Sequence, residues 1–326
     1  MNEKMNFIED TLMELDLSKI HPVLRDTAGH AISSGGKRLR PLICILSAEM
    51  VGGDYKSTRE TFLALELIHN ATLVHDDIID EDIYRRGLPA VHITNGVKKA
   101  VLTGDALLSM GLKYASKTGN PEVVNWLSET SLKMVQGIAL QSIRKGKISS
   151  EEEYLYMNYL KSGSLFEAAA ALGGVVGSGN PEHVKQLADF GKYFGNAYQI
   201  RDDIIDAFTL NGSDKKSKND LLNGDASLLL IYALESTLLP DSDKQKLLSI
   251  YNGETEDLNI PDLRRIYEKT GALQKSLEKM RFFSEQSKQC LSDFKDCESK
   301  KILYSLLEQY NYGLEENLIL ATSKLD

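Results

Sequence analysis

Two short segments hold the residues best suited to chemistry, because each concentrates aspartate on one face of a predicted helix. His75–Asp80 reads HDDIID and Arg201–Asp206 reads RDDIID. An α-helix turns about 100° per residue, so the three aspartates of each segment are expected to share one face. Like charges this close repel and cost stability unless a cation neutralises them. The aspartates are Asp76, Asp77, Asp80, Asp202, Asp203 and Asp206.

A single acidic cluster is usually a solvated helix face, and that is the alternative interpretation for either segment alone. Two matching clusters, each flanked by apolar rather than polar residues, favour a binding site instead. Mg²⁺ prefers oxygen ligands, commonly one or two carboxylates together with water or substrate phosphates. The sequence therefore predicts two facing acidic rows that hold a polyanionic ligand through bridging metal ions.

Basic residues supply the complementary chemistry. The segment Gly35–Pro41, GGKRLRP, contains Lys37, Arg38 and Arg40, and Arg85-Arg86-Gly87 follows the first acidic cluster. Arginine presents planar, bidentate donors that suit phosphate oxygens. Gly35–Pro41 lacks the spacing of a P-loop and alone could be an ordinary basic turn. With the acidic rows, it predicts two anionic groups, one bound through metals and one bound directly by cations.

His69 lies seven residues before Asp76, at nearly the same helical azimuth and about 10 Å away along the axis. A lone helical histidine is most often structural, but this one is expected to share a face with the aspartates. There is no HExxH pattern, and an all-oxygen metal site needs no nitrogen ligand. We therefore expect His69 to contact the ligand rather than a metal.

The elements that must position these residues are helical. Gly119-Asn120-Pro121-Glu122 and Gly179-Asn180-Pro181-Glu182 each combine an Asn N-cap with Pro at the first helical position. Ser150-Glu151-Glu152-Glu153 is a capping box. Apolar residues then recur at three-to-four spacing through 154–176 and 187–208, and no alternating run indicates a strand. We predict one all-α domain over residues 1–326.

Composition narrows the class of protein. The 326 residues contain 38 Lys and Arg against 47 Asp and Glu, a net charge of −9 that argues against nucleic-acid binding. Three cysteines without a CxxC pattern indicate neither a disulfide scaffold nor a zinc site. The N-terminus lacks the apolar core of a signal peptide, and no stretch is apolar for long enough to span a bilayer. We therefore expect a soluble protein of a reducing, cytoplasmic compartment.

The sequence resembles the trans-polyprenyl (isoprenyl) diphosphate synthases from about residue 34 to residue 234. The resemblance implies an all-α class I terpenoid synthase fold, a helical bundle around a central cavity, usually in a homodimer. It also implies a prenyltransferase that condenses isopentenyl diphosphate head-to-tail with an allylic diphosphate. The matching motifs, in order, are Gly36–Pro41, Glu66–His69, Asp76–Asp80 with Arg85–Gly87, Gly104-Asp105, Lys161-Ser162, and Phe194–Gln199 leading into Asp202–Asp206.

The resemblance assigns a role to each matching residue. Isopentenyl diphosphate would be held by Lys37, Arg40, His69 and Arg86. Three Mg²⁺ ions per active site, bridging the allylic diphosphate, would be ligated by Asp76, Asp80 and Asp202, supported by Asp77 and Asp206. Arg85 and Lys215 would contact the same diphosphate, while Lys161, Ser162 and Gln199 would line the reacting carbons. Asp203 completes the catalytic set. Departure of the diphosphate group from the allylic substrate would leave an allylic cation, which the isopentenyl double bond attacks.

Four positions depart from the family pattern. Ser162 stands where Thr is frequent, Ile138 replaces an acidic or polar residue, and Asp214-Lys215 replaces Gly-Lys. Asp225 stands where a diphosphate-binding Lys is common, and a carboxylate cannot pair directly with a phosphate. Either Lys215, Lys216 or Lys218 compensates, or the allylic substrate binds more weakly.

Product length follows from the helix face beside the first acidic row. Ala64, Ile68, Ala71 and Thr72 form a stripe there, which we interpret as one wall of an apolar tunnel. Small residues at 71 and 72 leave the tunnel open, so we predict a geranylgeranyl or longer product. In the alternative, residues such as Met110 or Leu112 close the tunnel lower down.

Three other functions remain as alternatives. A non-catalytic partner subunit of the same fold has only Ile138 and Asp225 in its favour. A terpene cyclase or squalene-type synthase needs no isopentenyl site, which leaves Lys37, Arg40 and His69 without a purpose. An HD-type phosphohydrolase is suggested only by His69 and the His75-Asp76 pair.

Overall fold

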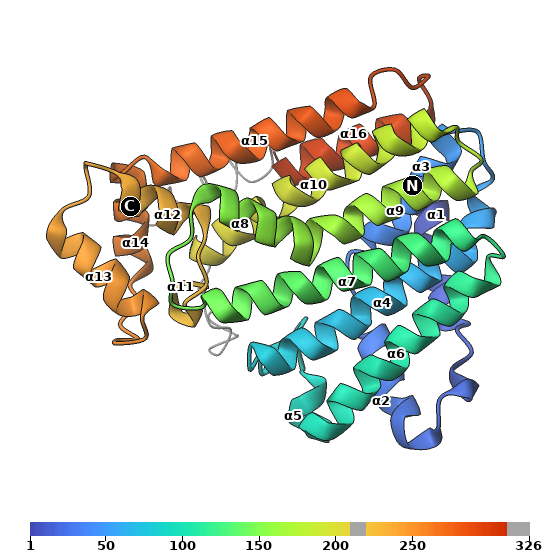
Figure 1. Cartoon of the computed structure of the whole chain (residues 1–326), viewed down its shortest axis with the longest axis horizontal. Coiled ribbons are helices and arrows are strands. Elements are labelled where there is room, and N and C mark those ends of the chain that lie inside the picture. The colour runs from blue at the N-terminus through green and yellow to red at the C-terminus, as the bar shows by residue number, and fades with distance from the viewer. Residues whose placement is uncertain (209–219, 312–326) are drawn as a thin grey trace.

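The computed structural model describes residues 1–208 and 220–311, and most of this part of the chain is helical (Figure 1). The α-helices of the first half are α1 Asn2–Met13, α2 Pro22–Ser33, α3 Leu39–Met50, α4 Arg59–Ile79, α5 Val91–Asn95, α6 Val97–Lys117, α7 Pro121–Arg144 and α8 Glu151–Asn158. Those that follow are α9 Ser164–Val176, α10 Pro181–Phe208, α11 Asp220–Asn223, α12 Leu228–Glu235, α13 Asp241–Tyr251, α14 Ile260–Lys269, α15 Ala272–Cys290 and α16 Glu298–Asn311. Two 3₁₀ turns, η1 Leu17–Lys19 and η2 Tyr55–Thr58, connect the early helices. The all-α fold class is confirmed.

Local capping signals set several helix starts. The Asn120 side chain accepts a hydrogen bond from the backbone N–H of Glu122 at the start of α7. Asn180 does the same for α10 through the N–H of His183. At the start of α8, Ser150 and Glu153 form both hydrogen bonds of the predicted capping box. The three predicted helix starts are confirmed. They could be predicted because each depends only on residues within one turn.

Two long helices, α4 and α10, form the centre of the molecule. α4 packs most extensively on α6, and α10 packs on both α9 and α15 (Figure 1). The buried apolar side chains fall into two clusters, one built on α3, α4, α6 and α9 and the other on α12 to α15. α10 contributes to both clusters, so it joins the two halves of the core.

Two local features differ from the uniform helical expectation. The predicted continuous helix over 154–176 is divided by one π-helical turn, η3 Tyr159–Gly163, between α8 and α9. A hairpin of two-residue strands, β1 Tyr84–Arg85 and β2 Leu88–Pro89, follows α4. Its turn residues Arg86 and Gly87 both have positive φ, at 55° and 76°, the geometry that matches a tight hairpin to strand twist.

Candidate active site

The first acidic row lies at the C-terminal end of α4 and faces the π turn. The Lys161 ammonium lies 3.2 Å from Asp76 Oδ2 and 3.7 Å from Asp80 Oδ2. Burial opposes the charge on Lys161, but the two carboxylates outweigh it and raise the pKa of this lysine. Lys161 is therefore held as a cation against the acidic row.

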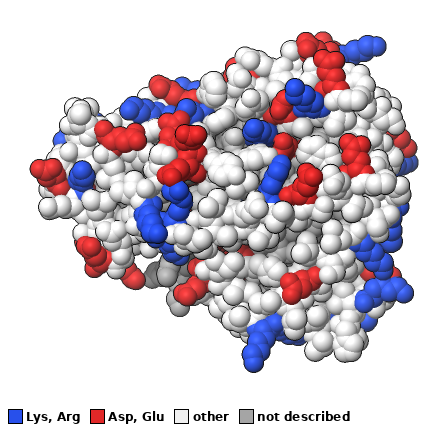
Figure 2. All heavy atoms as spheres, in the orientation of Figure 1, with Lys and Arg blue, Asp and Glu red and all other residues white. Residues whose placement is uncertain are grey.

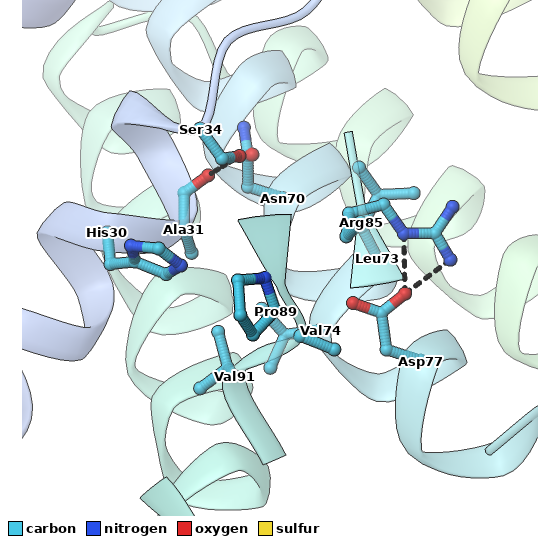
Figure 3. Close-up of a pocket in the computed structure, with 11 residues that line it drawn as sticks. His30, Ala31, Ser34, Asn70, Leu73, Val74, Asp77, Arg85, Pro89 and Val91 are labelled. Atoms are coloured by element: carbon cyan, nitrogen blue, oxygen red, sulfur yellow. Dashed lines mark hydrogen bonds and ion pairs between the residues drawn. The ribbon is translucent and has the colours of Figure 1, made fainter. Parts of the chain in front are cut away.

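The middle aspartate of each row points away from its neighbours, contrary to the expectation that all three share a face. Asp77 is buried and accepts hydrogen bonds from the Arg85 guanidinium, as Figure 3 shows. Asp203 is buried and accepts hydrogen bonds from Tyr154 and Gln199. One residue along a helix is about 100° around its axis, and that is enough to bring each carboxylate to a different partner.

The Asp77–Arg85 pair fixes the hairpin against α4. Arg85 also donates to Asp82 at 2.8 Å, so its guanidinium is engaged by two carboxylates. Beside the pair lies a small cavity of about 20 Å³, lined by His30 and Asn70 among others, as Figure 3 shows. That volume suits a single water rather than a substrate. In this structure the Arg85 guanidinium is paired with Asp77 and Asp82, whereas the family resemblance assigns it to the allylic diphosphate.

The charges of Asp82 and Asp225 act on an aspartate of each row, and we call the region around these carboxylates the acidic cavity. Burial raises the pKa of Asp80 to about 6, and the charges of Asp76 and Asp225 add to the effect. Burial likewise raises the pKa of Asp206, and Asp225 and Asp82 contribute to this shift. Asp206 lies on α10, whereas Asp82 follows α4. Asp82 and Asp225 are therefore close enough to interact with both Asp80 and Asp206.

The π turn brings the remaining catalytic candidates to this cavity. Ser162 donates to Gln199 Oε1 at 2.9 Å, and Gln199 Nε2 donates to Asp203 Oδ1 at 2.8 Å. The Gln199 amide is thus locked in one orientation. A Cβ on Gly137 of α7 would lie 2.5 Å from the Lys161 backbone nitrogen, so glycine is what lets α7 approach this turn. Single π turns of this kind occur frequently at functional sites.

A basic pocket of about 450 Å³ includes Lys37 and Tyr198, which both interact with Asp202 of the second acidic row. It contains all four residues predicted to bind isopentenyl diphosphate. The lining residues are Ser34, Gly36, Lys37, Arg38, Leu39, Arg40, Glu66, His69, Arg86 and Tyr198. The structure therefore brings together side chains from Gly35–Pro41, α4, the hairpin and α10.

Phe166 and His69 hold the Arg40 guanidinium in this pocket. The guanidinium lies 4.2 Å from the centroid of the Phe166 ring, and its Nη1 lies 3.2 Å from His69 Nε2. Arginine can only donate, so Nε2 of His69 is the acceptor and the imidazole proton lies on Nδ1. Burial, followed by the charges of Arg40 and Arg86, lowers the pKa of His69 well below its usual value. His69 is therefore neutral and orients Arg40.

Aromatic residues complete the pocket. Lys37 donates to the Tyr198 hydroxyl at 3.0 Å, and its ammonium lies 5.2 Å from the Tyr310 ring centroid. Burial raises the pKa of Tyr198 to about 12, so it remains a phenol. Tyr198 and Asp202 lie one turn apart on α10, as His69 and Asp76 lie two turns apart on α4. Both helices thus carry the basic pocket and the acidic row side by side.

Arg38 differs from its neighbours because its partners are internal. It is 5% exposed, and Nη1 donates to Glu66 Oε1 at 2.6 Å while Nε donates to Glu9 at 3.1 Å. Its φ of 48° is in the left-handed region that only the surrounding contacts can hold. Arg38 therefore anchors the segment that presents Lys37 and Arg40.

An apolar groove of about 450 Å³ lies beside the first acidic row, between α4, α6 and α7. Thr72, Ile78 and Ile138 line it. The other members of the predicted tunnel wall lie elsewhere, because Ile68 and Ala64 pack against α6 at Gly111 and Ala71 is buried in the core. The groove is open, since Val135 on α7 is 59% exposed.

The carboxylates fit a magnesium ion that is completed by a ligand. Asp76 Oδ1 is buried and has no hydrogen-bond partner, an arrangement that is costly unless a cation or ligand occupies the site. Within 1–208 and 220–311, no three acidic, His or Cys side chains converge closely enough to hold an ion by themselves. Mg²⁺ commonly takes only one or two carboxylates and obtains its other ligands from water and phosphates.

Several residues at the site received no role from the sequence. Tyr198 belongs to a matching motif, and Asp82 lies two residues after the first row, so both had a local signal. Gln141 and Asp220 reach the cavity only through tertiary packing, since Gln141 accepts from Lys161 at 2.7 Å and the Asp220 N–H donates to Asp206. Lys215 lies outside the described residues, as do Lys216 and Lys218.

Comparisons with known proteins agree with this geometry. The polyprenyl synthetase family model matches residues 21–273. A short chain isoprenyl diphosphate synthase of Methanothermobacter thermautotrophicus is 34% identical over 82% of this chain and 84% of its own length. A geranylgeranyl pyrophosphate synthase of Geoglobus acetivorans is 31% identical over 94% of both chains. The geranylgeranyl pyrophosphate synthetase structure from Pyrococcus horikoshii covers 94% of this chain and 95% of its own, with a TM-score of 0.85 and 31% identity. The chain therefore belongs to the polyprenyl synthetase family and is a polyprenyl diphosphate synthase, a transferase of prenyl groups.

Proposed function

We propose that this enzyme condenses isopentenyl diphosphate head-to-tail with an allylic diphosphate to form a trans product of geranylgeranyl length or longer. The observation that supports this most directly is that α4 and α10 each carry residues of the basic pocket and an acidic row. Two diphosphates can then bind side by side, one on cations and one across carboxylates. Proximity of the two substrates is itself a large part of catalysis.

In the basic pocket, Lys37, Arg40 and Arg86 supply positive charge for the isopentenyl diphosphate, while His69 holds Arg40 in place. In the acidic cavity, Asp76, Asp80, Asp202 and Asp206 are the proposed Mg²⁺ ligands. Three ions per site are what the family resemblance implies. Bound Mg²⁺ supplies electrophilic stabilisation of the leaving diphosphate.

The chain's own residues control the reacting carbons. Lys161 presents its ammonium at the acidic row, where negative charge develops as the allylic diphosphate leaves. The Gln199 carbonyl oxygen, oriented by Ser162 and by the Asp203 contact of its amide nitrogen, offers a fixed dipole near a developing carbocation. Asp203 and Asp77 act by orienting Gln199 and Arg85. The isopentenyl double bond is the nucleophile, and the proton that the isopentenyl unit then loses goes to the departing diphosphate, so neither a protein nucleophile nor a protein base is needed.

We further propose that residues 1–326 act as one domain and that two copies form a homodimer through α6 and α7. α10 spans both apolar clusters, which supports a single folding unit. Figure 2 shows few charged side chains over α7, where Leu132 and Val135 are 58% and 59% exposed. Exposed apolar patches of this kind mark interaction surfaces. No helix among the described residues has the length and apolarity to cross a bilayer. A cytoplasmic location stays a prediction.

A direct assay tests the proposed function. The purified protein is incubated with Mg²⁺, labelled isopentenyl diphosphate and, in separate reactions, dimethylallyl, geranyl, farnesyl or geranylgeranyl diphosphate, and the products are sized. We expect elongation that requires both substrates and stops at 20 carbons or more, with roughly a hundredfold or greater loss in Asp76→Asn and Asp202→Asn.

Other outcomes would overturn the proposal. A product formed without isopentenyl diphosphate would indicate a cyclase or squalene-type synthase, and phosphate release from nucleotides would indicate a phosphohydrolase. Lack of turnover that a second polypeptide restores would indicate a non-catalytic partner subunit.

A further inference from the structure

Asp225 follows α11 and extends a hydrogen-bonded chain into the acidic cavity. Gln141 of α7 joins the two ends of this chain. Its Nε2 donates to Asp225 Oδ1 at 2.9 Å, and its Oε1 accepts from Lys161 Nζ at 2.7 Å. The charges of Asp225 and Lys161 also attract each other directly, but the hydrogen-bonded link between the two residues runs through the Gln141 amide.

The charge of Asp225 determines which end of the amide faces Lys161. An ionised carboxylate can only accept hydrogen bonds, and an ammonium can only donate them. Gln141 must therefore turn its NH₂ group to Asp225 and its oxygen to Lys161. A flipped amide would oppose oxygen to carboxylate at one end and NH₂ to ammonium at the other, which loses both bonds.

The amide contact is the shortest of the three that hold the Lys161 ammonium. The others join Nζ to Asp76 Oδ2 at 3.2 Å and to Asp80 Oδ2 at 3.7 Å. Asp76 and Asp80 are also the proposed Mg²⁺ ligands, so during the reaction their carboxylates bind the metal as well. Gln141 is uncharged, and its hydrogen bond to Lys161 does not involve Asp76 or Asp80.

We infer that Asp225 is a positioning residue that, through Gln141, holds the Lys161 ammonium at the place where the allylic diphosphate binds. This inference rests on the proposed function. Asp225 would then have a role different from that of the diphosphate-binding lysine that is common at this position in the family. The site would then depend on a well-placed Lys161 rather than on a second lysine.

A double-mutant cycle tests the coupling. Gln141→Ala and Asp225→Ala are each expected to lower kcat for condensation by about 3- to 10-fold, with KM for isopentenyl diphosphate unchanged. The double variant is expected to be no worse than the poorer single variant, because both break one chain of contacts. Asp225→Asn, whose oxygen still accepts from Gln141, should recover most of the activity. Losses that multiply in the double variant would overturn the inference.

Reversal of the charge separates positioning from phosphate binding. Asp225→Lys should be worse than Asp225→Ala, because an ammonium there turns the Gln141 oxygen away from Lys161. Gln141→Glu should rescue Asp225→Lys, since a carboxylate accepts from two ammonium groups at once. If Asp225→Lys instead lowers KM for farnesyl diphosphate and raises kcat, the position serves phosphate binding and the inference is wrong.

Gln186 and Asp293 provide a matched control. They form the same amide-to-carboxylate contact, at 3.3 Å, on the exposed surface. Their alanine variants should leave kcat and KM unchanged. Thermal unfolding of every variant identifies misfolding, and Asp225→Asn keeps the test valid if the alanine variants unfold. If the wild-type protein fails to condense the two diphosphates, the proposed function itself fails, a result distinct from an active enzyme whose Gln141 and Asp225 effects multiply.

Discussion

At the level of single residues, the acidic row trades stability for ligand binding. The pKa of Asp80, about 6, means that its ionised form is disfavoured in the folded, metal-free protein. Between about pH 4 and pH 6 the folded protein keeps a proton that the unfolded chain has released. The free energy of unfolding therefore falls as pH rises through this window.

Asp80→Asn should accordingly separate stability from activity. Without Mg²⁺ we expect a higher midpoint of thermal unfolding than wild type at pH 7.5, and little difference at pH 4, because the amide carries no charge at either pH. We expect kcat to fall by roughly a hundredfold or more. Calorimetry at the two pH values with steady-state kinetics checks both. A variant less stable than wild type at pH 7.5 would contradict the assigned cost of the carboxylate.

Arg40→Lys tests recognition in the basic pocket. Lysine cannot reproduce the planar guanidinium stacked on Phe166 and hydrogen-bonded to His69, so we expect KM for isopentenyl diphosphate to rise about tenfold. KM for the allylic substrate should stay within about twofold, since that diphosphate binds elsewhere. Arg144→Lys, at an exposed pair with Glu153, is the control. Equal rises in both KM values would show that Arg40 does not discriminate between the sites.

At the level of elements, the active site depends on the close approach of α7 to the π turn. α7 supplies Gln141 and the turn supplies Lys161 and Ser162, so the distance between the two backbones sets the geometry of the cavity. The absence of a Cβ at Gly137 is what allows that distance. The backbone departs from regular α-helix geometry at Tyr159–Gly163, the turn that carries Lys161 and Ser162.

Gly137→Ala should therefore disturb both folding and catalysis. The added methyl would lie 2.5 Å from the Lys161 nitrogen, and overpacking against backbone costs about 1–3 kcal/mol. We expect a lower midpoint of thermal unfolding and at least a tenfold lower kcat. Gly29→Ala in α2 is the control, because its Cβ meets only Leu17 Cδ1 at 3.6 Å. An unchanged kcat in Gly137→Ala would show that the close approach of Gly137 to the Lys161 backbone does not matter for catalysis.

At the level of the whole molecule, the exposed apolar face of α6 and α7 is expected to hold a second copy. Leu132→Glu with Val135→Glu should convert a dimer to a monomer, because two charges would be buried without partners. Analytical ultracentrifugation measures the mass. Phe282→Glu on α15, where Phe282 is 53% exposed, is the control and should remain dimeric. A wild-type monomer at micromolar concentration would refute the proposed interface.

The apolar groove is expected to govern product length. Thr72→Phe places a ring in the groove beside the first acidic row, so the growing prenyl chain should meet an obstruction sooner and the product should be shorter. Chromatographic sizing of the products checks this. Ile143→Phe adds a ring to α7 outside the residues that line the groove and should leave the product unchanged. An unaltered product in Thr72→Phe would place the chain elsewhere.

Much of this protein follows from short-range patterns. The starts of α7, α8 and α10 depend on Asn120, Ser150 and Asn180, each of which acts within one helical turn. Helical periodicity places the outer aspartates of each row on one face. The lack of an alternating apolar run indicates no strand, and the described residues contain only the short hairpin of β1 and β2. The family motifs lie in order along the chain, so family membership was also accessible from the sequence.

Only the tertiary structure decided which side chains face each other. Asp77 and Asp203 turn to Arg85 and Tyr154 because a hairpin and a separate helix bring those partners near, and Tyr154 is 49 residues away from Asp203 in the chain. The division of one expected helix by a π turn, and the Gln141 bridge between distant residues, have the same origin. A hydrogen bond between remote segments depends on packing that no local pattern encodes, so these partners emerge only once the helices are assembled.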